Sequence, residues 1–271
     1  MSDTPRKARF PLGLASLQAR PAGPAVTTVR PQRPVHDAAR DRARQGMPSG
    51  QGLDSEAVRR RMVERLRAEG IDCAPVLQAL AAVPRHRFVD SALVAQAYED
   101  TSLPIGLGQT ISKPSVVARM LSLLFEGRLA GERGHLGRVL EIGTGCGYQT
   151  ALLATMATRV VSIERLKALH DKAALNLVDH RADQRIRLVW GDGRDGHAPL
   201  APFDSIVAAA GGDALPPAWL AQLAPGGRLV APMLDARSGR QSLLVVDHGP
   251  QGMVRQTHET VLFVPLKSGL A

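Results

Sequence analysis

A glycine-rich segment with a neighbouring acid is the feature of this sequence best suited to binding a cofactor. Residues Val139–Tyr148 read V-L-E-I-G-T-G-C-G-Y, which is typical of a buried strand that runs into a tight turn and then a helix. The glycines follow the spacing G-x-G-x-G, and Glu141 precedes them. A dinucleotide turn instead has the spacing G-x-G-x-x-G and faces a pyrophosphate. A carboxylate beside the turn repels phosphate, so this turn favours a cationic or amino-bearing ligand.

Two further acids follow the next two predicted strands. Glu164 lies 21 positions after Gly143, close to the spacing at which an acid accepts hydrogen bonds from ribose hydroxyls. Asp192, in the sequence W-G-D-G, is placed to accept from an adenine amino group. Glu164 would repel a 2′-phosphate and disfavours NADP, whereas NAD remains compatible with Glu164 alone. The third acid and the glycine spacing favour S-adenosylmethionine, with S-adenosylhomocysteine as the product.

Each of these acids also has a structural alternative. Glu164 can pair with Arg165 or Lys167, and Asp192 can form an Asx turn with its own backbone.

The elements that must position these residues alternate along the second half of the chain. Predicted helices between the strands imply a parallel sheet covered on both faces. The last two predicted strands lack an intervening helix and indicate antiparallel strands at one edge. The fold class is therefore α/β, with a doubly wound, mostly parallel sheet. The predicted strands are Arg138–Ile142, Val160–Ile163, Ile186–Trp190, Phe203–Ala208, Gly227–Pro232, Gln241–Val246 and Thr260–Pro265. The helices predicted among them are Tyr148–Ala157, Leu166–Val178 and Pro217–Leu223.

Helical spacing of apolar residues also predicts an N-terminal helical portion before the sheet. The stretch from Tyr98 to Ile111, with its proline and glycines, reads as a loop. The predicted helices here are Asp54–Glu69, Ala74–Val83, Phe88–Ala97 and Pro114–Phe125.

The positive charge of the chain is concentrated in its first 53 residues. They hold nine basic and three acidic residues and so carry six of the nine net positive charges. Their Pro- and Arg-rich composition predicts a disordered basic extension, residues 1–53, ahead of a domain over residues 54–271. The rest of the chain is nearly balanced in charge, so nucleic acid is not favoured as a partner, apart from weak contact through the extension.

No apolar run approaches the length of a membrane span, and two cysteines do not form a disulfide framework. We therefore expect a cytoplasmic protein without membrane contact and without a metal. Cys146, inside the glycine turn, is better explained as a small packing residue than as a nucleophile.

The residues after the fourth strand narrow the choice of methyl acceptor. Methyltransferases acting on amines often place an Asn/Asp-Pro-Pro-aromatic motif there, but Ala208–Gly211 reads A-A-A-G. A carboxylate acceptor is ionised at neutral pH, because its pKa is about 4, and needs no base. It needs a neutral hydrogen-bonding clamp and a dry site, and a wall of alanines is compatible with both.

The segment Tyr98–Pro114, Y-E-D-T-S-L-P-I-G-L-G-Q-T-I-S-K-P, resembles the loop characteristic of the protein-L-isoaspartate (D-aspartate) O-methyltransferase family. The resemblance runs from about residue 55 to the end of the chain. The P-I-G-x-G-Q-T-I-S part of the loop is specific, whereas many methyltransferases share the glycine turn. Lys113 and Cys146 depart from the family pattern. Further matching segments are Val83–Val89, Val139–Tyr148, Ser162–Arg165, Gly191–Gly193, Ala201–Asp204, Leu223–Val230 and Phe263–Leu266.

The resemblance implies methyl transfer from S-adenosylmethionine to the free α-carboxylate of L-isoaspartyl residues in damaged proteins, with D-aspartyl residues as a further substrate. The ester would then close to a succinimide and begin repair. Ser112 matches the serine assigned to the family's active site, although no evident base activates it. We expect it to orient the substrate carboxylate, to cap the helix that begins near Pro114, or both. His86 is better explained by a structural or substrate-facing role than as a base.

The expected cofactor-binding residues are Glu141, Gly143, Thr144, Gly145, Gly147, Glu164, Arg165, Asp192 and Gly193. The expected substrate or lid residues in the loop are Ile105, Gly106, Gln109, Thr110 and Ile111.

Three other functions remain open from the sequence. They are methylation of another carboxylate or of a small hydroxyl compound, cofactor binding without turnover, and the nucleic-acid methylation that the net charge of +9 invites.

Overall fold

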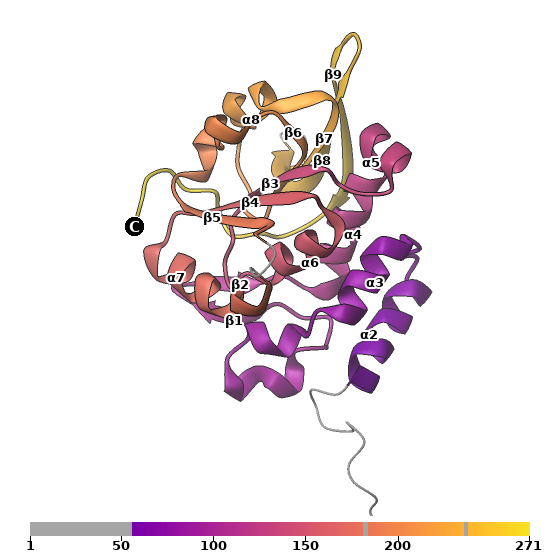
Figure 1. The fold of residues 1–271 in the computed structure, drawn as a ribbon, viewed down its shortest axis with the longest axis vertical. Coiled ribbons are helices and arrows are strands. Elements are labelled where there is room, and N and C mark those ends of the chain that lie inside the picture. Colours follow the sequence, from indigo (N-terminus) through magenta and orange to yellow (C-terminus); the bar gives the residue numbers. More distant parts are fainter. Residues whose placement is uncertain (1–55, 181–183, 236–237) are drawn as a thin grey trace, which may run out of the picture. The chain divides into compact units, whose positions relative to one another are not determined.

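The computed structural model describes residues 56–180, 184–235 and 238–271 (Figure 1). The predicted basic extension, residues 1–53, lies outside the described residues. Among the described helices, none is both long and apolar enough to cross a membrane.

A seven-stranded sheet forms the centre of the described chain, in the order β5-β4-β3-β6-β7-β8-β9 (Figure 1). Strands β3 to β7 are parallel, and β8 and β9 continue the sheet as antiparallel hairpins. The chain moves outward from β3 in one direction through β4 and β5, and then in the other through β6 and β7. This reversal beside β3 is the point at which doubly wound sheets bind ligands. The strands are β3 Arg138–Ile142, β4 Arg159–Glu164, β5 Ile186–Trp190, β6 Phe203–Ala208, β7 Leu223–Asp235, β8 Arg240–Gly249 and β9 Gly252–Thr260.

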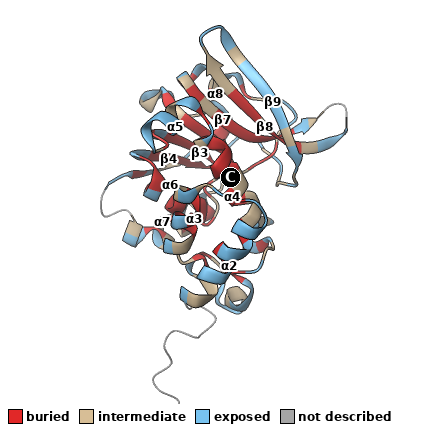
Figure 2. Cartoon of the chain, turned by 90° about the vertical axis from the view of Figure 1, so that its right-hand side faces the viewer, coloured by how far each residue is buried: buried red, intermediate tan, exposed pale blue. Residues whose placement is uncertain are grey.

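Alternating side chains of the parallel strands enter two separate cores. Val139 and Val207 pack into the core on one face, whereas Leu140 and Ile206 pack into the core on the other. Figure 2 shows the central strands as buried and the edge strand β9 as largely exposed. The two-faced burial explains why the strands read as almost continuous apolar runs.

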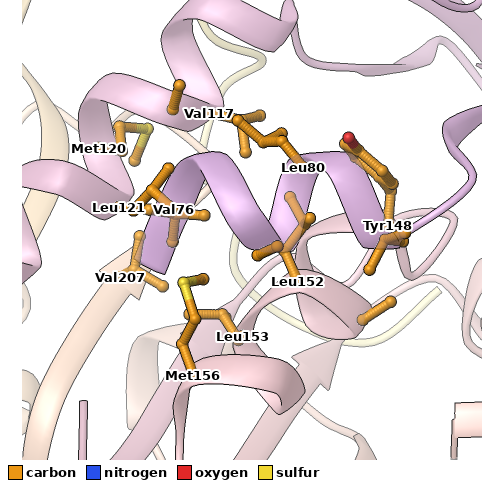
Figure 3. Packing of buried hydrophobic residues seen from close by; sticks show 14 of the residues in the cluster. Val76, Leu80, Val117, Met120, Leu121, Tyr148, Leu152, Leu153, Met156 and Val207 are labelled. Carbon is orange, nitrogen blue, oxygen red and sulfur yellow. The ribbon is translucent and has the colours of Figure 1, made fainter. Parts of the chain in front are cut away.

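The helical portion packs on the first of these faces. Figure 3 shows Val76 and Leu80 of α3 lying between side chains of α4 and α6, and Val207 of the sheet beneath them. The second face is covered around Trp219 of α8. The helices are α2 Glu56–Ala68, α3 Ala74–Ala82, α4 Pro114–Phe125, α5 Arg128–Arg133, α6 Tyr148–Met156, α7 Lys167–Asn176 and α8 Pro217–Ala221. Short 3-10 turns are η2 Arg85–Phe88, η3 Ser91–Gln96, η4 Val178–His180, η5 Gly193–Asp195 and η6 Ala198–Leu200.

The predicted fold class is confirmed, with several local corrections. The segment predicted as a helix over Phe88–Ala97 forms the 3-10 turns η2 and η3, because Asp90 accepts from the Ala92 N–H and starts a new turn. The segment read as a plain loop contains a hairpin of β1 Leu103–Gly106 and β2 Gln109–Ile111.

The last strand was also predicted in the wrong place. Instead of Thr260–Pro265, the structure has β9 at Gly252–Thr260, paired with β8. The apolar residues that suggested a strand after Thr260 belong to a segment whose backbone bonds to Gly211 instead.

Candidate active site

A pocket lies at the carboxyl ends of β3, β4 and β6, beside the reversal of the strand order. One wall is the glycine turn and the end of β4, and a second is the β1–β2 hairpin with the residues that follow it. The remaining wall comes from the end of β6 and from the C-terminal segment, residues 261–271, which follows β9. The predicted residues that line this pocket are Ile105, Gln109, Thr110, Ile111, Ser112, Gly143, Thr144, Gly145, Glu164, Arg165 and Gly193.

The glycine turn needs its glycines because of backbone geometry. Gly145 has φ of 57° and Gly147 has φ of 91°, both in the left-handed region that favours glycine. A Cβ on Gly147 would also approach Leu177 Cδ1 to 2.9 Å. Gly147 itself does not line the pocket and instead allows α6 to start close to α7. The turn thereby directs the backbone N–H of Gly145 toward the end of β4.

Glu164 is held in place from two sides at the end of β4. Its Oε2 accepts from the Gly145 N–H at 3.0 Å, and its Oε1 accepts from the Leu166 N–H at 2.9 Å. The side chain is buried yet lines the pocket. No ion pair joins Glu164 to Arg165 or Lys167 in the described part of the chain. Each carboxylate oxygen keeps a lone pair for a further donor such as a ribose hydroxyl.

Glu141 lies behind the glycine turn rather than on the pocket surface. It is completely buried and accepts hydrogen bonds from Gln149 Nε2 at 3.1 Å, Ser162 Oγ at 2.7 Å and Thr150 Oγ1. Ser162 Oγ in turn contacts Thr144 Oγ1 at 2.6 Å. Burial raises the pKa of Glu141 to about 7, although its hydrogen bonds oppose that rise. Glu141 therefore joins β3, β4, α6 and the turn into one unit.

Asp192 binds the C-terminal segment of the chain. Its Oδ1 accepts from the Arg194 N–H at 2.9 Å, which is the Asx-type contact considered from the sequence, and its Oδ2 accepts from the Gly269 N–H at 2.6 Å. Arg165 Nε also donates to the Gly269 carbonyl at 2.9 Å. Asp192 is not among the pocket-lining residues, but its neighbour Gly193 is. Trp219 Nε1 donates to the Gly193 carbonyl at 2.7 Å and holds this residue in place.

Ser112 belongs to the pocket wall formed by the β1–β2 hairpin and the residues that follow it. It directly follows β2 and lines the pocket, and no hydrogen bond to its hydroxyl is found among the described residues. The prediction that it caps the following helix is wrong. Lys113 holds the cap position of α4 without a side-chain bond, and Asp100 supplies the cap from outside the helix. Asp100 accepts from the Ser115 N–H at 2.8 Å and from Ser115 Oγ at 2.7 Å.

Two other residues considered from the sequence have structural roles. His86 Nδ1 lies 2.7 Å from the Tyr98 hydroxyl, and His86 is not among the pocket-lining residues. Cys146 is buried, and burial raises the pKa of its thiol, so the thiol is neutral and packs as a small apolar group.

Part of the pocket lining was not predicted from the sequence. Glu141, Gly147, Asp192 and Gly106 are the predicted residues that do not line it. The wall formed by the C-terminal segment was not predicted, and the matching Phe263–Leu266 segment was the available signal. Ala209 and Ala210, from the alanine segment noted in the sequence, also line the pocket. The pocket-lining residues that were not expected are Leu107, Val117, Ile142, Cys146, Tyr148, Gln149, Ile163, Leu166, Leu169, Val264, Pro265, Leu266 and Lys267.

The strand order, the glycine turn and the acid at the end of β4 define an S-adenosylmethionine-dependent methyltransferase with a Rossmann-like fold. The family model described as "Protein-L-isoaspartate(D-aspartate) O-methyltransferase (PCMT)" matches residues 57–271. The chain therefore belongs to this family.

Proteins named protein-L-isoaspartate O-methyltransferase are similar over nearly the whole chain. One from Methylibium petroleiphilum is 61% identical over 264 residues, covering 96% of each chain. One from Leptothrix cholodnii is 59% identical over 277 residues, covering 99% of this chain and 96% of that one.

Solved structures agree with the fold. A protein-L-isoaspartate O-methyltransferase matches with a TM-score of 0.68 and 26% identity, over 78% of this chain and 67% of that chain. A putative Plasmodium falciparum enzyme of the same name, crystallised with S-adenosyl-L-homocysteine, matches with a TM-score of 0.65 and 24% identity. That match covers 76% of this chain and 96% of the other.

We predict that Glu164→Gln weakens S-adenosylhomocysteine binding about tenfold or more, equivalent to about 1.4 kcal/mol. The amide has one acceptor oxygen, and its NH₂ would face a backbone N–H that the carboxylate now accepts. Titration calorimetry measures the affinity, and Glu132→Gln on the exposed surface of α5 is the matched control. Equal affinities for Glu164→Gln and wild type would contradict a ribose contact.

We also predict a pH-dependent stability term from Glu141. Its pKa is raised in the folded state, so its contribution is fully present below the unfolded pKa of about 4.5 and is lost as pH rises through about 7. The free energy of unfolding of wild type relative to Glu141→Gln should therefore fall by roughly 3 kcal/mol between about pH 4 and about pH 8. Denaturant titrations of both proteins at the two pH values measure this difference. A difference that does not change with pH would show that the carboxyl does not titrate in this range.

Proposed function

We propose that this enzyme transfers a methyl group from S-adenosylmethionine to the free α-carboxylate of L-isoaspartyl residues, and of D-aspartyl residues, in damaged proteins. The observation that carries the proposal is one pocket with a cofactor wall around Glu164 and a neutral hydroxyl, Ser112, on the opposing hairpin. Membership of the family supports the same reaction. The ester formed would then close to a succinimide and begin repair.

The proposed reaction needs no general base. A carboxylate oxygen attacks the methyl carbon, the carbon–sulfur bond breaks, and its electron pair stays on sulfur. An anion and a sulfonium cation thereby become two neutral molecules, and no proton moves. A largely apolar environment favours this loss of charge, because water stabilises the separated ions more than the products. Ile142, Ile163, Ala209 and Ala210 supply apolar surface in the pocket.

Ser112 orients the acceptor in this proposal and does not act as a nucleophile. No histidine is among the described lining residues, and the Cys146 thiol is neutral. The lining carboxylate Glu164 accepts from two backbone N–H groups and has no hydrogen bond to Ser112 among the described residues, so no base is paired with the hydroxyl. A serine hydroxyl can donate to one carboxylate oxygen and leave the other free to attack. Positioning of this kind accounts for much of the rate of a direct transfer.

The remaining site residues divide into two groups. We assign Gly143, Thr144, Gly145, Glu164, Arg165 and Gly193 to the cofactor, and Ile105, Gly106, Gln109, Thr110 and Ile111 to the substrate side. Glu141 and Gly147 support the turn from behind, and Asp192 remains the proposed adenine contact. We further propose that residues 54–271 form the catalytic domain of a cytoplasmic enzyme. Damaged proteins are its partners, and nucleic acid has no part in catalysis.

The direct test is labelled-methyl transfer to an isoaspartyl peptide, with the matching aspartyl peptide as control. We expect label on the isoaspartyl peptide alone, as a base-labile ester. Transfer to another carboxylate or hydroxyl compound, with none to the isoaspartyl peptide, would replace the proposed substrate. Binding of S-adenosylhomocysteine without any transfer would indicate a protein that binds the cofactor but lacks turnover. A chain beginning after residue 50 should keep the activity if the basic extension is irrelevant to catalysis.

Ser112→Ala should lower kcat for the isoaspartyl peptide by roughly 10- to 100-fold, because the carboxylate loses an orienting donor. Its affinity for S-adenosylhomocysteine should change less than about twofold, since Ser112 stands on the acceptor side. Steady-state kinetics and calorimetry measure the two effects. Ser115→Ala is unsuitable as a control, because Ser115 donates to Asp100 in the cap of α4. Ser91→Ala is suitable, because Ser91 is exposed. Unchanged turnover in Ser112→Ala would remove Ser112 from the mechanism.

A further inference from the structure

Arg85 is a fully buried cation next to the acceptor side of the pocket. It belongs to η2, and none of its surface is exposed. No ion pair to Arg85 is found among the described residues, and its Nη1 is buried without a hydrogen-bond partner. Burying a charge without a counter-ion is costly, so the fold must gain something specific from the guanidinium.

The guanidinium binds both ends of the β1–β2 hairpin. Nη2 donates to the Ser112 carbonyl at 2.8 Å, directly after β2, and to the Thr101 carbonyl at 3.5 Å, just before β1. Nε donates to the Ala97 carbonyl at 2.8 Å. Three main-chain carbonyls between residues 97 and 112 therefore accept hydrogen bonds from one planar side chain.

The same guanidinium contacts the cofactor side of the molecule. Arg85 Cζ lies 4.9 Å from the ring centroid of Tyr148, the first residue of α6. Tyr148 follows the glycine turn directly, and its ring is buried. Arg85 thus connects the base of the hairpin to the helix that starts at the cofactor turn.

The Arg85 guanidinium holds the Ser112 peptide by its carbonyl. Ser112 stands between the end of β2 at Ile111 and the start of α4 at Pro114, outside the bonding of either element. Its carbonyl is held by Arg85, and its hydroxyl is left for the pocket. Rotation of this peptide would move the hydroxyl relative to the methyl donor, and small displacements of reacting groups cost large factors in rate.

We infer that Arg85 is a positioning residue for methyl transfer, which fixes the Ser112 hydroxyl against the cofactor turn by holding the Ser112 carbonyl. This rests on the proposed function of Ser112. Arginine suits the task because its fork presents several donors in one plane, whereas the lysine ammonium is a point charge on a flexible stem.

The test is a double-mutant cycle with Arg85→Lys, Ser112→Ala and the double variant, using transfer to an isoaspartyl peptide. If Arg85 acts through Ser112, Arg85→Lys should lower kcat about tenfold in the wild-type background and less than about twofold in the Ser112→Ala background. Affinity for S-adenosylhomocysteine should stay within about twofold in all three variants, because the cofactor wall is intact. Equal losses in both backgrounds would mean a general structural role and would overturn the proposal.

Arg65→Lys is the matched control for the cycle. Arg65 Nη2 also donates to a main-chain carbonyl of this segment, that of Tyr98 at 2.9 Å, but it does not reach either end of the hairpin. It should leave kcat within about twofold, since the Ser112 peptide is untouched. A loss equal to that of Arg85→Lys would show that any arginine that donates to this segment matters, and it would overturn the specific role.

Folding is checked by thermal melts and by S-adenosylhomocysteine binding. If Arg85→Lys does not fold, Arg85→Gln takes its place in the cycle, because its side-chain NH₂ group can still donate to a carbonyl. Failure of both variants to bind S-adenosylhomocysteine would assign Arg85 to the fold alone and overturn the proposal. Unchanged turnover in Ser112→Ala by itself would instead contradict the proposed role of Ser112, so the two ideas fail by different results.

Discussion

The buried carboxyl group of Glu141 is the interaction on which the cofactor side of this enzyme depends. It accepts from side chains of α6 and β4, and through Ser162 it is linked to Thr144 in the glycine turn. A carboxyl group in this position cannot be solvated by water, so its partners must keep their places to satisfy it. The turn is consequently fixed to two strands and a helix before any ligand binds. Glu164 can then present its oxygens to the pocket, because the same turn donates the Gly145 N–H to it.

The pocket has two sides that are built in different ways. The cofactor side comes from one continuous strand–turn–helix unit and the strand beside it, which are close in sequence and paired in register. The proposed acceptor side combines segments far apart in the chain, namely the β1–β2 hairpin, the end of β6 and the C-terminal segment. Backbone bonds from Gly211 to Val264 and Leu266 hold that last segment against the sheet. This division matches a reaction in which a common methyl donor meets a specific acceptor.

Two buried ionisable groups, Glu141 and Arg85, stabilise these two sides by the same principle. Neither has an ion-pair partner in the described part of the chain, and each binds several neutral polar groups instead. Multiple hydrogen bonds to one charged group restrict geometry more than a surface ion pair does. Burial also carries a cost, which is visible in the raised pKa of Glu141 and the lowered pKa of Arg85. Such groups are useful where precise placement matters more than maximal stability.

Apolar periodicity and glycine spacing in the sequence determined the fold class and the cofactor turn. The bounds of β3, β5, β6 and α4 agree with the pattern, because each has a regular apolar repeat and a clear end. The hairpin within Leu103–Ile111 was missed, since its short strands contain a proline and glycines that signal a loop. The edge strand was displaced for a related reason: β9 is mostly polar, and the apolar residues after it pack elsewhere.

What each polar side chain binds was decided by the tertiary structure. Asp100 caps α4 from 15 residues away, so Ser112, which the local sequence made a plausible cap, is left free for the pocket. Glu141 lies one residue before the end of β3 and Glu164 is the last residue of β4, yet Glu141 is enclosed behind the turn and Glu164 lines the pocket. The two glutamates differ because α6 packs over Glu141 and donates to it, whereas Glu164 lies at the edge of the sheet that borders the pocket. Local sequence therefore specified the central strands, their helices and the available chemistry, whereas long-range packing specified the hairpin, the edge strand and which groups meet.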